Sequence, residues 1–186
     1  MRNRHRFGII LAVVATVAIT SAAPAAADSI YADSVDGNVT GFASLRCLDA
    51  KAEELGRNGT AIQLWDCYGS SQLNQLWYKH TPPNTYKVQL RSRYDNRCLD
   101  ADWQTIGQNG TKVQLWDCYG AEQRNQLWEF WHTPNVGIVQ IRNVQTGQCL
   151  DADYWGFGQN GTRVQLWDCY GLGSHNQLWF LPRAWY

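Results

Sequence analysis

Apolar and polar residues alternate in several short stretches of the chain. The clearest lie at residues 87–91 and 138–142, and residues 111–116 follow the same pattern in part. Such alternation is typical of β-strands that turn one face toward a core and the other toward solvent. Asn-Gly, Gly and Pro-Pro segments separate these stretches, and none keeps a helical period with caps. The pattern predicts an all-β fold built from short strands.

One segment occurs three times, at a spacing of 51 residues. Each copy contains, in order, Cys-Leu-Asp-Ala, Asn-Gly-Thr, Gln-Leu-Trp-Asp-Cys-Tyr-Gly and Asn-Gln-Leu-Trp. The spacing is constant, so we place the repeats at about 36–86, 87–137 and 138–186. Closing three equivalent units about an axis would remove the exposed strand edges that a small β-domain must avoid.

The six cysteines divide equally among the copies, with a separation of 20 residues in each. An even number of cysteines in an exported chain indicates disulfides, although sequence alone leaves several connectivities open. Pairing within each copy is the parsimonious choice, because it treats equivalent cysteines alike. A zinc site is the alternative, but the short Cys-x-x-Cys ligand pairs are missing, and we expect no metal. The predicted disulfides are Cys47–Cys67, Cys98–Cys118 and Cys149–Cys169.

The first residues have the order of a signal peptide. A region with three arginines is followed by an apolar run at residues 7–19 and by small residues up to Ala27. The apolar run is shorter than the roughly 20 residues of a membrane-spanning helix. We therefore expect a signal peptide at 1–27, secretion of residues 28–186, and no membrane insertion.

The charge balance changes when residues 1–27 are removed. Three of the 16 basic residues lie there, which leaves 13 basic against 16 acidic residues. A mildly acidic chain is poorly suited to the phosphate backbone of nucleic acid. We expect a monomer that binds neither nucleic acid nor a cofactor.

The repeated motifs resemble the ricin B-chain-type lectins and the family 13 carbohydrate-binding modules. Their hallmark, Gln-x-Trp, stands here at residues 75–77, 126–128 and 177–179. The resemblance extends from about residue 36 to residue 186. It implies a β-trefoil with pseudo-threefold symmetry, in which three hairpins cap a six-stranded barrel. It also implies one shallow sugar site for each repeat.

The resemblance assigns roles to five residues of the first repeat. Asp49 would accept bonds from two sugar hydroxyls, while Trp65 would stack on the apolar face of the ring. Asn74 would bond a hydroxyl, Gln75 would steady Asp49, and Gln63 would lie at the rim. A sugar needs a flat aromatic surface, charge-assisted acceptors and amides that both donate and accept. The equivalent residues are Asp100, Gln114, Trp116, Asn125 and Gln126 in the second repeat, and Asp151, Gln165, Trp167, Asn176 and Gln177 in the third.

The copies differ immediately after the site aspartate. The first has Lys-Ala-Glu, the second Asp-Trp-Gln and the third Asp-Tyr-Trp. We add the extra aromatics Trp103 and Tyr154 to the predicted ligand-binding residues. Our hypothesis is that the second and third sites bind more tightly or reach a second sugar unit, and that the first is the weakest.

Several of these residues also have structural interpretations. The aspartates Asp49, Asp100 and Asp151 could cap turns, and the tryptophans of Trp-Asp-Cys could be structural. We interpret the Gln-x-Trp tryptophans as core, and the aspartates of Trp-Asp-Cys, which adjoin the cysteines, as structural.

Other functions compete with sugar binding. A glycosidase needs two carboxylates about 5 to 9.5 Å apart, and Asp49 with Asp66 is the candidate pair. Every such carboxylate recurs in triplicate, however, whereas an enzyme would need one unrepeated pair. A binding subunit of a separate enzyme or toxin is a second alternative, and a trefoil that binds only proteins is a third. We predict a secreted, non-catalytic lectin for galactose, lactose or xylan-type glycans that acts by multivalent binding.

Overall fold

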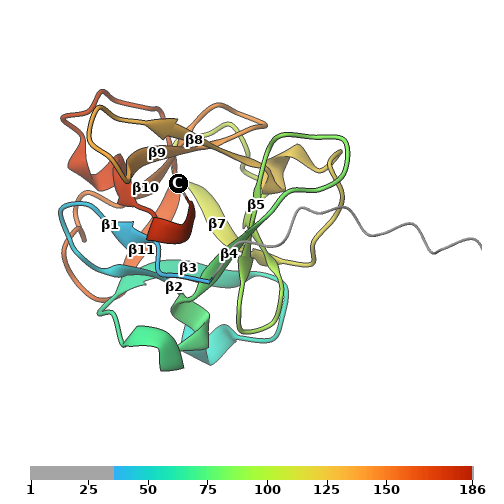
Figure 1. Ribbon diagram of the computed structural model, residues 1–186, viewed down its shortest axis with the longest axis horizontal. Helices are drawn as coiled ribbons and strands as arrows, with labels where there is room; N and C mark the ends of the chain where they lie inside the picture. Colours follow the sequence, from blue (N-terminus) through green and yellow to red (C-terminus); the bar gives the residue numbers. More distant parts are fainter. Residues whose placement is uncertain (1–35, 186) are drawn as a thin grey trace, which may run out of the picture. The chain divides into compact units, whose positions relative to one another are not determined.

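The computed structural model describes residues 36–185, and the expected signal peptide at 1–27 lies outside them. The described part consists of short β-strands and single turns of 3-10 helix (Figure 1). No helix among these residues is long and apolar enough to cross a membrane. The strands are β1 Thr40–Gly41, β2 Cys47–Ala50, β3 Thr60–Trp65, β4 Trp77–His80, β5 Gln89–Ser92, β6 Cys98–Ala101, β7 Thr111–Trp116, β8 Trp128–His132, β9 Ile138–Asn143, β10 Cys149–Ala152, β11 Thr162–Trp167 and β12 Trp179–Phe180. The 3-10 turns are η1 Ala52–Glu54, η2 Gly69–Ser71, η3 Leu73–Gln75, η4 Arg124–Gln126, η5 His175–Gln177 and η6 Arg183–Trp185.

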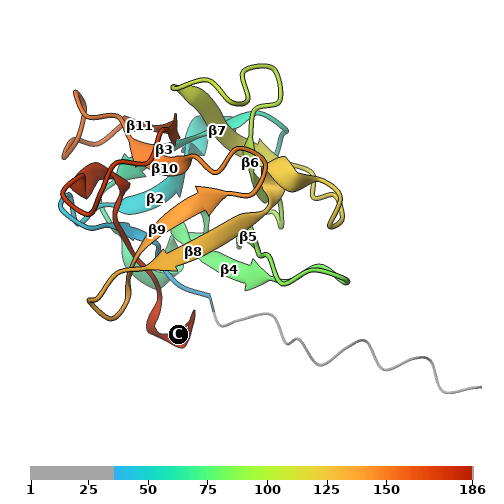
Figure 2. The same ribbon diagram turned by 90° about the horizontal axis from the view of Figure 1, so that it is seen from above.

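Six strands, β1, β4, β5, β8, β9 and β12, close into a barrel. Antiparallel pairing joins β4 to β5, β8 to β9, β9 to β12, and β12 to β1. Isolated bridges from Gly37 to Trp77 and from Val88 to Trp128 complete the ring. Figure 2 shows four of these strands, β4, β5, β8 and β9, side by side.

The other six strands form three hairpins, β2–β3, β6–β7 and β10–β11. Their second strands, β3, β7 and β11, also pair with one another, which ties the hairpins into a cap. A six-stranded barrel capped by three hairpins is a β-trefoil, so the predicted fold class is confirmed.

The Gln-x-Trp tryptophans lie in the core, as predicted. Trp77, Trp128 and Trp179 have no exposed surface. Each indole N–H donates to a backbone carbonyl, that of Leu48, Leu99 or Leu150, at 2.9, 3.0 and 3.0 Å. Buried leucines, isoleucines and valines of all three repeats pack around them. The repeated tryptophan therefore fastens each barrel strand to the hairpin of its own repeat.

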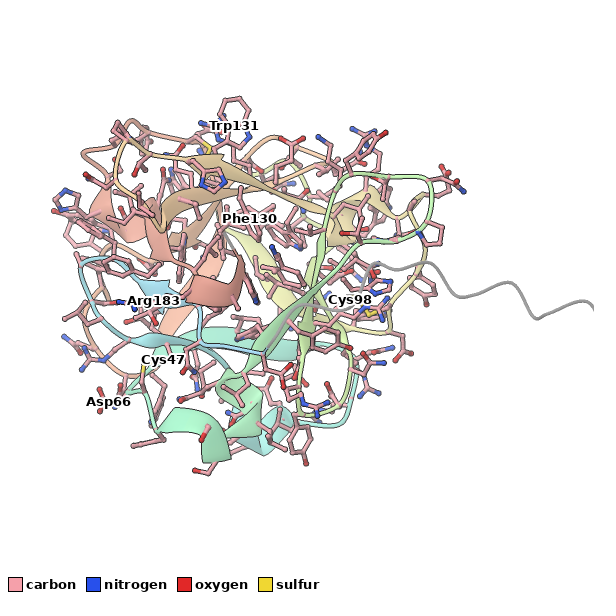
Figure 3. All side chains as sticks on the ribbon, viewed as in Figure 1. Cys47, Asp66, Cys98, Phe130, Trp131 and Arg183 are labelled. Atoms are coloured by element: carbon pink, nitrogen blue, oxygen red, sulfur yellow. A yellow bond between two sulfur atoms is a disulfide. The ribbon has the colours of Figure 1, made fainter. Side chains whose placement is uncertain are left out.

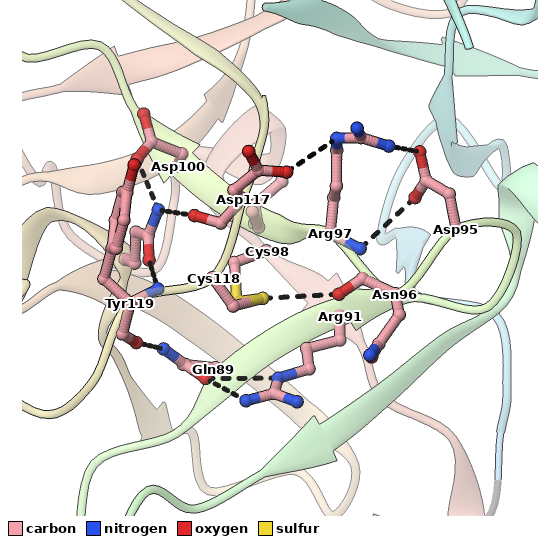
Figure 4. The surroundings of a disulfide bond; sticks show 12 residues. Gln89, Arg91, Asp95, Asn96, Arg97, Cys98, Asp100, Asp117, Cys118 and Tyr119 are labelled. Carbon is pink, nitrogen blue, oxygen red and sulfur yellow. Dashed lines mark hydrogen bonds and ion pairs between the residues drawn. A yellow bond between two sulfur atoms is a disulfide. The ribbon is translucent and has the colours of Figure 1, made fainter. Parts of the chain in front are cut away.

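The three disulfides have the predicted connectivity, Cys47–Cys67, Cys98–Cys118 and Cys149–Cys169. Each joins the first residue of one hairpin strand to a residue just beyond the other strand, as Figure 4 shows for Cys98 and Cys118. All six sulfur atoms are used, so the zinc alternative is wrong. Loops of this length contribute about 3 kcal/mol each in the chain-entropy treatment of cross-links.

Candidate functional site

Three amide side chains hold the carboxylate of Asp49. Gln63 Nε2 donates to its Oδ1 at 2.9 Å, while Asn74 Nδ2 and Gln75 Nε2 donate to its Oδ2 at 2.9 and 3.0 Å. Asp49 lies on β2 directly opposite Gln63 on β3, and η3 supplies the other two amides. Pairing of the hairpin strands and one 3-10 turn therefore bring four sequence-predicted residues together.

The second and third repeats build the same cluster. Around Asp100, the bonds from Gln114, Asn125 and Gln126 measure 3.1, 2.9 and 3.0 Å. Around Asp151, the bonds from Gln165, Asn176 and Gln177 measure 3.1, 2.9 and 2.9 Å. The recurrence agrees with the pseudo-threefold symmetry of the fold. Figure 4 shows one of the hydrogen bonds to the Asp100 carboxylate.

The hydrogen bonds determine which atoms remain for a ligand. Gln75 has no exposed surface; its Nε2 also donates to the Asp66 carbonyl, and its Oε1 accepts the backbone N–H of Tyr68. Gln75 is therefore a positioning residue. Asn74 Nδ2 also donates to the Ala50 carbonyl at 2.8 Å, so its oxygen is the atom available to a hydroxyl. In the second repeat Gln123 donates to that oxygen of Asn125.

Burial changes the pKa of the three site carboxylates. The side chains lie at the bottom of the site, with 4 % of each aspartate exposed. Loss of hydration raises the pKa of Asp49, Asp100 and Asp151 above the ordinary value for aspartate, and the amide hydrogen bonds oppose this rise. The amides thus offset part of the cost of placing a negative charge here.

The stacking residue expected beside each carboxylate is half-buried, not part of the core. Trp65 ends β3 and lines the same pocket as Asp49, and Trp167 shares a pocket with Asp151. Trp116 has the same intermediate exposure at the end of β7. The geometry therefore brings an indole and a carboxylate to one surface pocket in the first and third repeats.

Those two pockets differ in size. The first repeat has a cavity of about 140 Å³, whereas that of the third repeat is about 770 Å³. Small-molecule sites usually occupy about 300–1,000 Å³. The larger pocket is additionally lined by Tyr154 and Trp155, whose rings meet edge-to-face at 5.8 Å. Trp103, the counterpart of Tyr154, is exposed in the turn after β6.

Sequence reasoning missed some of the lining residues. Tyr68 and Tyr170 line the first and third pockets, and their hydroxyls accept the indole N–H of Trp65 and Trp167 at 3.4 and 3.3 Å. A tyrosine follows the second cysteine in every copy, so the repeat itself carried the signal. Trp155 and His175 also line the third pocket, but no repeat pattern marks them.

Beside the sites, hydrogen bonds join neighbouring repeats to one another. Asn58 Nδ2 donates to Asp117 Oδ2 at 2.9 Å, the Asp117 backbone N–H donates to Asn58 Oδ1, and Arg97 bonds both residues. Figure 4 includes the Arg97–Asp117 ion pair. We call this three-residue unit the junction clamp. Equivalent clamps are Asn160, Asp66 and Arg46, and Asn109, Asp168 and Gln148.

The junction clamps support the structural interpretation of Asp66, Asp117 and Asp168. They also place an Asn-Gly turn beside the stacking ring of the next repeat. A Cβ on Gly161 would lie 3.9 Å from Trp65, and one on Gly110 would lie 3.9 Å from Trp167. Both glycines have positive φ, 84° and 90°, which favours glycine there.

Comparison with known proteins agrees with this architecture. The family model for the ricin-type β-trefoil lectin domain matches residues 35–179. Volkensin from Adenia volkensii is 31 % identical over 121 residues, or 65 % of this chain and 19 % of its own length. Serine protease 1 from Rarobacter faecitabidus is 30 % identical over 134 residues, or 72 % of this chain and 21 % of its own length. The chain thus spans about a fifth of these curated relatives.

A solved structure gives the same result for the fold. The Macrolepiota procera ricin B-like lectin, determined in complex with lactose, has a TM-score of 0.65 and 19 % identity, with coverage of 83 % of this chain and 99 % of that one. The fold and the repeated site define a trefoil of the lectin class. The chain belongs to the ricin-type β-trefoil lectin domain family.

Proposed function

We propose that the chain is a secreted lectin with up to three shallow sugar sites, and that it acts by multivalent binding without catalysis. One observation carries the proposal: in every repeat, three amides of that repeat hold a carboxylate that is almost fully buried. Galactose, lactose and xylan-type glycans are the proposed ligands. Support for lactose comes from the Macrolepiota procera lectin, whose structure contains that sugar.

The proposed binding uses the atoms that the amides leave available. Sugar hydroxyls would donate to the carboxylate of Asp151, and the oxygen of Asn176 would accept a further hydroxyl. The C–H face of the ring would stack on Trp167. Charge-assisted bonds are the stronger ones, so the ionised carboxylate provides most of the polar recognition.

Each site alone should bind weakly. Millimolar binding corresponds to about −4 kcal/mol, which is what one stacked ring and a few solvent-exposed bonds supply. Three sites on one molecule can raise the apparent affinity for a dense glycan surface by about 10² to 10⁴. The proposed activity is therefore cross-linking of glycan-bearing surfaces.

The contacts favour binding over hydrolysis. Asp66, the partner nominated for Asp49 in a glycosidase, is bound in a junction clamp by Arg46 and Asn160. It does not line the pocket that contains Asp49. The second alternative is a binding subunit of a separate enzyme or toxin, and the curated relatives are longer chains of which this one matches about a fifth. That alternative retains the same sugar sites.

The test combines binding, agglutination and hydrolysis assays. We expect the secreted protein to bind lactose or xylo-oligosaccharides in calorimetric titrations, to agglutinate glycan-coated beads, and to release no reducing sugar from xylan. A variant that combines Trp65→Ala and Trp116→Ala keeps one site, so it should bind the free sugar but fail to agglutinate. Agglutination at the parent level would show that multivalency is not the mechanism, and release of reducing sugar would favour the glycosidase.

A further inference from the structure

The second repeat carries an aromatic platform that the other two repeats lack. Trp131 on β8 is 51 % exposed, and positions 80 and 182, which are equivalent by the 51-residue spacing, hold histidine and proline. The other two repeats form the barrel with different residues at this position. The barrel itself therefore does not require Trp131. Trp131 and its surroundings are therefore candidates for a separate role.

Neighbouring side chains hold the Trp131 ring in place. Its indole N–H donates to Glu129 Oε2 at 3.0 Å, and the Arg142 guanidinium lies 3.8 Å from the ring centroid. Glu129 also accepts a hydrogen bond from the ammonium group of Lys87. These bonds lower the pKa of Glu129, so the carboxylate is ionised at neutral pH. An orienting carboxylate and a cation thus fix an exposed indole before any ligand arrives.

The platform borders a cavity of about 460 Å³, which lies within the usual range for small-molecule sites. Lys87, Glu129, Phe130 and His132 line it together with Trp131 and the exposed ring of Tyr86. Figure 3 shows Trp131 and Phe130 together, well separated in that view from Cys47 and Asp66 of the first repeat. None of the fifteen predicted repeat-site residues lines this cavity.

We propose that this cavity is a fourth carbohydrate-binding site, outside the threefold set. A pyranose would stack its C–H face on the open side of Trp131, and its hydroxyls would bond the Glu129 carboxylate and the Lys87 ammonium. The site offers a fixed aromatic surface, an ionised acceptor and a donor, which are the groups that a polyol on an apolar ring requires. It involves no residue of the three repeat sites, so it is independent of the function proposed for them.

The test removes the repeat sites first. Trp65→Ala, Trp116→Ala and Trp167→Ala together delete the three repeat stacking rings. This triple variant is titrated with lactose and with xylohexaose, by calorimetry and by NMR of the indole N–H groups. We expect residual binding that shifts the Trp131 resonance and that a further Trp131→Ala change weakens about tenfold. Tyr94→Ala is the matched control, because Tyr94 is 50 % exposed in the same repeat and does not line the cavity.

The possible results separate the two proposals. If the parent binds either sugar and the triple variant binds neither, the fourth site is rejected while the function proposed for the repeats stands. If parent and triple variant bind equally and Trp131 shifts in both, the fourth site is supported and the repeat sites are contradicted. A Trp131→Ala change that alters only the oligomeric state in sedimentation would identify a protein interface and overturn the sugar assignment. A titration in which neither the parent nor the triple variant binds sugar would also overturn it.

Discussion

The first and third repeats place the same five site residues in different surroundings. After Asp49 the chain forms η1, where Lys51 pairs with Glu54, and the cavity measures about 140 Å³. After Asp151 two aromatic residues extend a cavity of about 770 Å³. Under the proposed function, the repeated residues would give a common point of attachment, and the unrepeated rim would decide how much ligand each site can hold.

The largest expected effect on sugar affinity is that of removing the carboxylate of Asp151, compared with that of Asp49. Asp151→Ala should weaken binding of a linear oligosaccharide about a hundredfold, since two charge-assisted bonds of about 1.5 kcal/mol each are lost. Asp49→Ala should have a far smaller effect, because the third site dominates. Calorimetric titration of both variants measures this, with thermal melting to verify that each is folded. Equal losses would contradict the proposed ranking of the sites.

A smaller effect is expected at the rim. Tyr154→Ala combined with Trp155→Ala should weaken oligosaccharide binding about tenfold and leave monosaccharide binding nearly unchanged, because only the second sugar unit loses its stacking surface. The converse variant, Lys51→Asp with Ala52→Tyr and Glu53→Trp, should strengthen oligosaccharide binding by the first repeat. If the substitutions weaken monosaccharide and oligosaccharide binding equally, the rim does not form a second subsite.

Sugar binding and the contribution of the site aspartates to stability should respond to acid in opposite directions. The pKa values of Asp49, Asp100 and Asp151 are raised, so these groups protonate at higher pH than an ordinary aspartate. A raised carboxyl pKa means that the folded state binds the proton more tightly than the unfolded chain does. As the pH falls through the raised values, these groups therefore add to stability while the ionised acceptor is lost. Titrations with lactose test the binding, and melting curves of the parent and of Asp151→Asn from pH 7 downward test the stability, because the lowered pKa values of Glu54 and Glu129 act equally in both proteins. A stability difference between the two proteins that does not change with pH would refute the expectation.

The smallest effect concerns the junction clamps. The first repeat uses Arg46 against Asp66 at 3.3 Å, whereas the third has Gln148 against Asp168 at 3.4 Å. Gln148→Arg should restore the ion pair and stabilise the fold by about 0.2–1 kcal/mol, as expected for an exposed pair. Denaturant unfolding at low and high salt measures the gain. A destabilised variant would show that the glutamine is needed where it is.

Much of the fold was predictable because a repeat defines equivalence. Three copies at one spacing identified the disulfide partners and the core tryptophans Trp77, Trp128 and Trp179. Periodicity does not indicate which surfaces of neighbouring repeats are in contact, however. The hydrogen bonds between Asn58 and Asp117 could therefore not be predicted. The bond from Gln63 to Asp49 was missed because it depends on the register of two strands. The role proposed for Trp131 could not be predicted because it depends on the contact with Arg142, on the neighbouring strand.

The junction clamps have a consequence for production of the protein. Asn58, Asn109 and Asn160 each stand in an Asn-Gly-Thr sequence, which meets the acceptor pattern for N-linked glycosylation. The nitrogen that an oligosaccharyltransferase would modify is the atom that donates to the neighbouring aspartate. Glycans added in a eukaryotic host before folding would therefore oppose closure of the ring of repeats, so a bacterial host is the better choice.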